Sequence, residues 1–131
     1  MDFKKASEIL NRYRWEGVRY NYVSESGEGE RDIAGVEVRI LLPFPSNERI
    51  GRIMAERIAR YHGIIFGEYD ANLGREEGPC YKPAFCVFCR SEDEIEPGIE
   101  RMKLARNELD DNFEKLAEIP FYPSADNYLH D

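Results

Sequence analysis

The chain has 131 residues, a net charge of −8 and 42% apolar residues. This length is typical of a single domain, which needs no disulfide or metal to hold it together. No stretch approaches the ~18 consecutive apolar residues of a membrane span, and the N-terminus lacks the basic-then-apolar order of a signal peptide. The sequence therefore predicts a cytoplasmic protein that makes no use of a membrane.

Charge is unevenly spread along the chain. Residues 91–118 carry ten acidic side chains against four basic ones, whereas residues 1–22 and 46–62 each have a small positive balance. A uniformly basic surface is excluded, so nucleic acid is an unlikely partner, although a local basic patch fits this balance. The chain also lacks Thr and Gln, and Arg outnumbers Lys 13 to 5. This bias is typical of proteins from hot environments, and chance in a short chain is the alternative.

Hydrophobic periodicity predicts seven elements in the order αββαββα. Apolar residues recur at helical spacing in three segments and alternate with polar residues, or form short runs, in four others. Ser46 is the expected N-cap of the second helix, and Pro97 suits the first turn of the third. The predicted helices are 3–15, 47–61 and 97–118, and the predicted strands are 18–23, 33–42, 63–69 and 83–90.

The last predicted strand, 83–90, is apolar on both faces, which is typical of a central strand covered on both sides. Pairing it with 33–42 gives an α+β, ferredoxin-like sandwich with a four-stranded, mostly antiparallel sheet in the order 1-2-4-3. The second and third helices would cover one face, and the first helix or another subunit would cover the other. Residues 1–119 would form this domain, and 120–131 an irregular tail packed on the domain or on a neighbouring subunit.

The three cysteines follow the pattern C-x5-C-x2-C, at Cys80, Cys86 and Cys89. Cys86 and Cys89 lie three residues apart in a predicted strand, so they should point to opposite faces and should not share a metal ion. We therefore predict no metal and no cofactor, with these two thiols acting as small apolar side chains. A metal, a redox role and an internal disulfide are the alternatives.

The long loop at 68–81 is the candidate site of an enzyme or a ligand-binding domain. Glu68 and Asp70 would act as acid–base or metal-binding groups, and Cys80 would be a nucleophile if a neighbouring base or cation lowers its pKa. The spacing matches no phosphate-loop or catalytic motif, and solvated loop charges produce the same pattern. The candidate ligand-binding residues are Arg75, His62 and Tyr81.

Basic and aromatic residues interleave in 12–15 (Arg-Tyr-Arg-Trp) and 19–22 (Arg-Tyr-Asn-Tyr). Such mixtures can stack on bases and grip phosphates. A helix-to-strand junction in a protein core has the same appearance, and the acidic balance of the whole chain favours that explanation.

Three classes of function stay open. The absence of a catalytic signature favours a small non-enzymatic binding or regulatory module that acts as a homo-oligomer. The second class is the small enzyme or ligand-binding domain with its pocket under 68–81. The third is an inhibitor or adaptor that presents the acidic third helix to a basic protein, in binding that salt would weaken. The candidate interface residues are Leu104, which lies off its helical stripe, and Tyr122 and Tyr128 in the aromatic tail.

Overall fold

The computed structural model describes residues 1–24, 33–70 and 76–118. All seven predicted helices and strands are present in the predicted order, with two short 3-10 turns between them. In chain order the elements are α1 (Phe3–Arg12), η1 (Arg14–Glu16), β1 (Val18–Ser24), β2 (Ile33–Leu41), α2 (Arg49–His62), β3 (Ile65–Asp70), β4 (Tyr81–Cys89), η3 (Glu92–Glu94) and α3 (Ile95–Glu118).

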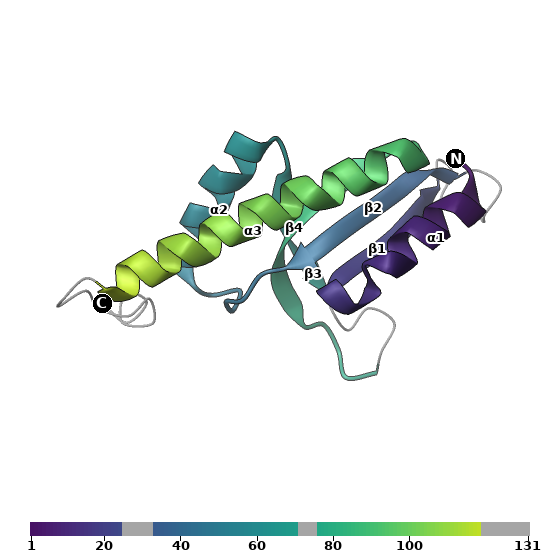
Figure 1. Cartoon of the computed structure of the whole chain (residues 1–131). Helices are drawn as coiled ribbons and strands as arrows, with labels where there is room; N and C mark the ends of the chain where they lie inside the picture. The colour runs from purple at the N-terminus through teal and green to yellow at the C-terminus, as the bar shows by residue number, and fades with distance from the viewer. Residues whose placement is uncertain (25–32, 71–75, 119–131) are drawn as a thin grey trace.

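The four strands form one sheet in the order β1-β2-β4-β3, and every neighbouring pair is antiparallel (Figure 1). The α2 helix connects β2 to β3, and β4 lies between these two strands. The predicted α+β class and the strand order 1-2-4-3 are therefore confirmed. Among the described helices, none has both the length and the apolar character that crossing a bilayer requires.

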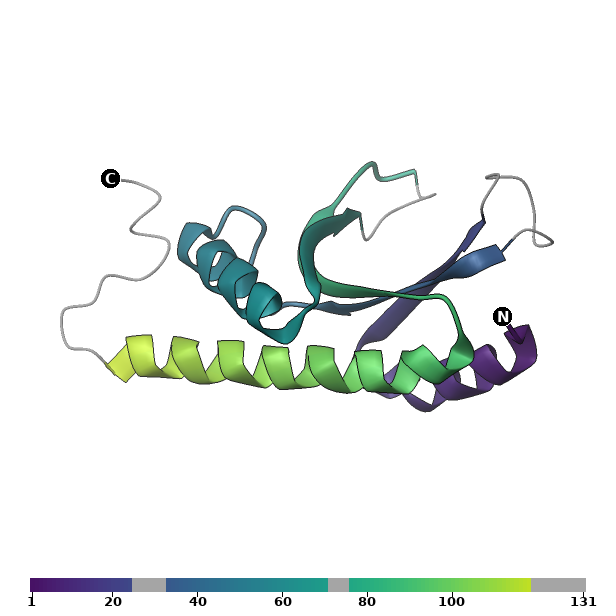
Figure 2. The same ribbon diagram turned by 90° about the horizontal axis from the view of Figure 1, so that it is seen from above.

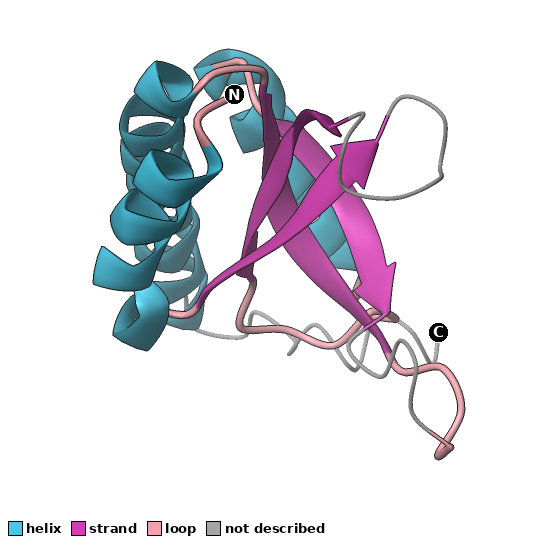
Figure 3. Ribbon diagram, turned by 90° about the vertical axis from the view of Figure 1, so that its right-hand side faces the viewer, coloured by secondary structure: helices cyan, strands magenta, loops and turns pink. Residues whose placement is uncertain are grey.

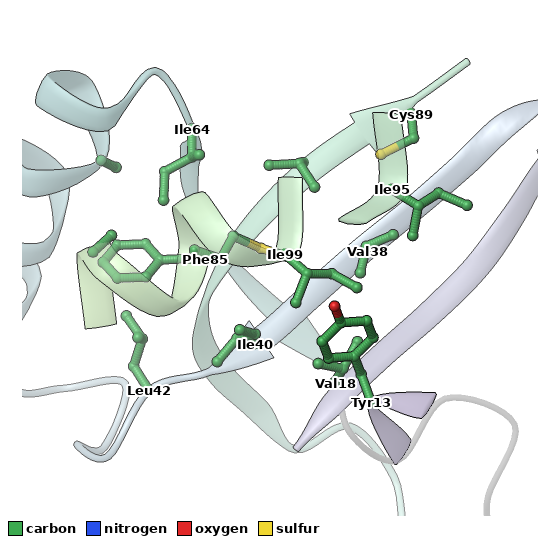
Figure 4. Packing of buried hydrophobic residues seen from close by; sticks show 14 of the residues in the cluster. Tyr13, Val18, Val38, Ile40, Leu42, Ile64, Phe85, Cys89, Ile95 and Ile99 are labelled. Carbon is green, nitrogen blue, oxygen red and sulfur yellow. The ribbon is translucent and has the colours of Figure 1, made fainter. Parts of the chain in front are cut away.

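Strand alternation places one row of side chains of β2 and β4 in the core. Val38 pairs with Val87 and Ile40 pairs with Phe85, and all four side chains are buried. The α3 helix packs over them, because its apolar residues recur every three or four positions along one side. Figure 4 shows this packing between the helix and the sheet. The buried residues of α3 are Ile95, Ile99, Met102, Ala105 and Leu109.

The α1 helix lies on the same side of the sheet as α3. The Phe3 ring is centred 4.1 Å from that of Tyr22, and Ser7 Oγ lies 2.9 Å from Tyr22 Oη. Tyr22 is opposite Val36, whose side chain points into the core under α3. Of the two alternatives for the other face, cover by the first helix is therefore wrong, and cover by another subunit stays a prediction.

Polar contacts tie the C-terminal end of α1 and the following η1 turn to α3, in addition to the apolar side chains that α1 buries in the core. Tyr13 Oη donates a hydrogen bond to Glu96 Oε1 at 2.9 Å, and Lys103 Nζ lies 2.7 Å from Glu16 Oε1. In Figure 2, α1 accompanies the first half of α3 and α2 accompanies its second half. The contacts of α1 and α2 with α3, and of α2 with β3, place all three helices on the side of the sheet that carries the core.

The N-cap of α2 also differs from the prediction. Glu48 occupies this position, and its Oε1 accepts hydrogen bonds from the backbone N–H groups of Ile50 at 3.1 Å and Gly51 at 3.5 Å. The expected cap, Ser46, instead donates through Oγ to the carbonyl oxygen of Tyr81 at 2.6 Å. The Ser46 hydroxyl, which the local pattern assigned to the helix cap, is therefore used in a contact with β4, a strand that is distant in sequence.

Replacing Tyr13 by phenylalanine should change how stability depends on alkaline pH. Burial, followed by the bond to Glu96, raises the pKa of Tyr13 from 10.0 to about 12. The stabilisation from this raised pKa is complete below about pH 10 and is lost as pH rises towards 12, because only the unfolded chain readily releases the proton. We expect Tyr13→Phe to be less stable than wild type at neutral pH by about 1 kcal/mol, with a shallower alkaline decline. Urea unfolding at stepped pH tests this, and parallel declines would contradict it.

Candidate binding surface on the open face of the sheet

Strand alternation places a second set of side chains on the side of the sheet opposite the helices, where those at the centre (Arg39 and Ala84) are buried and those around them are partly or largely exposed. In the described part of the chain, no helix or strand packs against this side (Figure 3). The middle of β4 is nevertheless covered on both sides, as expected, because Ala84 and Phe85 point to opposite faces and are both fully buried, although the described helices lie on one face only. We call this surface the open face, and it consists of Arg19, Asn21 and Val23 of β1, Gly35, Glu37, Arg39 and Leu41 of β2, Lys82, Ala84, Cys86 and Phe88 of β4, and Ile65, Gly67 and Tyr69 of β3.

Arg39 lies at the centre of the open face and is only 5% exposed. Its Nη1 donates to Glu37 Oε1 at 3.2 Å, and its guanidinium carbon lies 3.4 Å from the centre of the Tyr69 ring. When the Asn21 amide is oriented so that its nitrogen donates to the carbonyl oxygen of Tyr20, its oxygen accepts a hydrogen bond from Arg39 Nη2 at 3.1 Å. The buried Nε has no hydrogen-bond partner within the described structure. A buried donor without a partner is costly, so this nitrogen is a weak point in an otherwise satisfied cluster.

The charges on the open face are mostly positive. Arg19 lies directly opposite Arg39 on the neighbouring strand, and like charges in this position destabilise a sheet. Glu37 is the one carboxylate of the open face, against the cationic side chains of Arg19, Arg39 and Lys82. The open face thus has a positive balance in a chain whose net charge is −8.

Exposed apolar side chains flank this charged centre. Ile65 is 60% exposed and Phe88 is 41% exposed, and Val23 is also exposed. The Phe88 ring lies across Gly35, since a Cβ atom at that glycine would be 2.7 Å from Phe88 Cζ. Apolar side chains beside a few charged groups are typical of a surface that docks another macromolecule.

The two strand cysteines point to opposite faces, as predicted. Cys86 is opposite Arg39 on the open face, whereas Cys89 is opposite Val36 in the core. Burial is the main cause that raises the pKa of each thiol to about 11. A raised pKa lowers the thiolate fraction, so neither thiol is activated as a nucleophile. The described residues contain no group of three or more His, Cys, Asp or Glu side chains placed to hold a metal ion.

The candidate residues of the 68–81 loop are engaged mainly in structural contacts. Asp70 Oδ1 accepts a hydrogen bond from the backbone N–H of Cys80 at 2.9 Å, which joins the two ends of the loop. Glu68 Oε1 lies 3.4 Å from Arg52 Nη1 on α2. Cys80 and Tyr81 are exposed, and Arg75 lies outside the described residues.

His62 is not close to Cys80. It ends α2 just before β3 begins, whereas Cys80 lies beside Asp70 at the other end of this strand. The histidine Nε2 lies 2.6 Å from Glu108 Oε2 on α3. The structure therefore does not bring this base and this thiol together, and the enzyme hypothesis stays a prediction without a described nucleophile–base pair.

One of the three candidate interface residues lies in the described part of the chain. Leu104 is exposed on α3, in the helical layer, and Tyr122 and Tyr128 lie outside the described residues. Two acidic residues of α3 are already bonded within the domain, Glu96 to Tyr13 and Glu108 to His62. The hypothesis of an adaptor with an acidic helix stays a prediction.

Sequence reasoning missed the buried stack of Arg39 on Tyr69. The alternation of 33–42 placed Arg39 on the side of the strand opposite Val38 and Ile40, but it carried no information about the partners of this side chain. A scan against family models found no match for this chain, and searches of curated proteins and of solved structures also found none.

Proposed function

We propose that the protein is a non-enzymatic binding module that forms a homodimer through its open face. The observation that carries this proposal is a four-stranded sheet with described helices on one side only and exposed Ile65 and Phe88 on the other. Such a sheet normally buries its second apolar face against another layer. The three cysteines, which are all unpaired, fit our expectation of a reducing, cytoplasmic setting.

A second copy suits this surface through its apolar side chains, which two copies can bury against each other despite the positive balance of each face. The open face carries apolar side chains together with charges of both signs, so a two-fold axis allows Glu37 of one copy to meet a cation of the other. Two sheets that pack face to face also form a common and stable arrangement, with side chains interdigitating between layers about 10 Å apart.

The test is the oligomeric state of Phe88→Glu measured by analytical ultracentrifugation across a concentration series. We expect wild type to be a dimer at micromolar concentration. The new carboxylate would lie directly opposite Glu37 and would lose its hydration in the interface, so both effects oppose association. We expect the dimer dissociation constant to rise by roughly 100-fold or more, equivalent to about 2.7 kcal/mol.

The matched control is Leu104→Glu, which makes the same kind of change at an exposed apolar residue of the helical layer. It should leave the dimer intact, and circular dichroism should show that both variants are folded. A wild type that is monomeric at micromolar concentration would refute the dimer. If Leu104→Glu dissociates the dimer and Phe88→Glu does not, the interface lies on α3 and the open-face proposal is wrong.

A further inference from the structure

A cavity of about 480 Å³ lies at the outer edge of the sheet, between the end of α1, η1 and β1. Leu10 and Val18 line it with apolar surface, and the polar lining comes from Asn11, Arg14 and Arg19. Trp15 and Tyr20 add two aromatic rings. We call this cavity the edge pocket, and its volume falls within the range of about 300–1,000 Å³ that is typical of small-molecule sites.

Trp15 is the unusual feature of the edge pocket, because its side chain is 88% exposed. The core-junction explanation of the 12–15 segment holds for Tyr13, which is buried, but not for Trp15. Arg14 is the one described group that stacks on this ring, and its guanidinium carbon lies 5.2 Å from the ring centre. Tryptophan normally buries most of its large apolar surface. Its exposure beside a cavity leaves a ring face for a planar ligand.

The two arginines of the edge pocket lack carboxylate partners within the described structure. The ion pairs of the described residues are formed by other basic side chains, and neither Arg14 nor Arg19 takes part in one. Arg19 Nη1 donates to the carbonyl oxygen of Val18 at 3.2 Å, which directs the guanidinium group towards the sheet edge. Two unpaired guanidinium groups in a chain of net charge −8 indicate a site for an anion.

We propose that the edge pocket binds a nucleotide, with the base stacked on Trp15 and the phosphate held by Arg14 and Arg19. An aromatic face and two guanidinium groups together match a ligand that has a planar ring and a phosphate, because stacking and charge-assisted hydrogen bonds act on different parts of it. Asn11 adds an amide to the polar lining. The site is additional to the open-face dimer and shares Arg19 with that surface.

Trp15 is the single tryptophan of the chain, so tryptophan fluorescence reports on this pocket alone. The wild-type protein is titrated with adenosine monophosphate, and calorimetry gives an independent dissociation constant. We expect saturable quenching, with weaker binding of adenosine and of inorganic phosphate, which each lack half of the ligand. Arg14→Ala and Arg19→Ala should each weaken binding about 10-fold, and Trp15→Leu should weaken it in calorimetry.

The control is Arg49→Ala, which removes an exposed arginine of α2 outside the pocket and should leave affinity unchanged. A short oligoadenylate shows whether the natural ligand is a free nucleotide or a single-stranded nucleic acid. Much tighter, salt-dependent binding of the oligoadenylate than of adenosine monophosphate indicates a single strand, and equal affinity for the two indicates a free nucleotide. The proposal is overturned if neither probe binds saturably, or if Arg49→Ala weakens binding as much as the pocket variants do.

Discussion

Replacing Phe85 by alanine is expected to lower the free energy of unfolding by about 3–5 kcal/mol. Phe85 is fully buried in β4, opposite Ile40 on one neighbouring strand and Phe66 on the other. Its removal leaves a cavity between the sheet and α3 that the surrounding side chains fill only in part. Domains of this size are typically stable by only about 5–15 kcal/mol, so the variant should be marginally folded.

Urea unfolding followed by circular dichroism measures this loss, at a low and constant protein concentration. The matched control is Phe88→Ala, which removes the same ring from the same strand but on the open face, where it is 41% exposed. Phe88→Ala should lower the free energy of unfolding clearly less than Phe85→Ala does. Equal losses from the two variants would mean that both faces of β4 are buried to the same extent, which would contradict the one-sided core.

Replacing Gly35 by alanine is expected to lower the free energy of unfolding by about 1–3 kcal/mol, although the change adds one methyl group. A Cβ atom at this position would lie 2.4 Å from the carbonyl oxygen of Cys89 and 2.7 Å from Phe88 Cζ. The carbonyl belongs to the backbone of the adjacent strand, so the sheet itself has to shift. The Phe88 ring would also be displaced from the open face.

Gly67→Ala is the control for this prediction, because it makes the same change on the open face of β3. A Cβ atom at Gly67 would meet no atom within 4 Å, and alanine there lowers the entropy of the unfolded chain. We expect this variant to be neutral or more stable by a few tenths of a kcal/mol to about 1 kcal/mol. Similar destabilisation by both substitutions in urea would show that general loss of glycine, rather than the close approach at Gly35, is responsible.

The open face and the edge pocket meet at β1, where Arg19 belongs to both. Arg19 is opposite Arg39 on the open face and lines the cavity beside Trp15. A phosphate bound at Arg19 would offset the repulsion between these two arginines, because it supplies the negative charge that the open face largely lacks.

The order of the elements and the pairing of the strands followed from the sequence by itself. The alternation of Val36, Val38 and Ile40 identified the core side of β2, and the apolar stripe of 97–118 identified the side of α3 that packs on it. The spacing of Cys86 and Cys89 placed them on opposite faces. These features were predictable because each depends on a local period, of two residues in a strand or 3.6 in a helix.

Only the tertiary structure decided which layer α1 joins, which residue caps α2 and what surrounds Arg39. The apolar arc of α1 shows that this helix packs on something. Contacts with distant residues, such as that of Tyr13 with Glu96, show that its neighbour is α3. Ser46 and Glu48 are both competent caps, and the distant carbonyl of Tyr81 engages the serine. The stack of Arg39 on Tyr69 joins β2 to β3 across β4. Periodicity in the sequence indicates that a side chain is buried. It does not indicate which residues the side chain contacts, because these come from segments far along the chain and become neighbours only when the segments pack together.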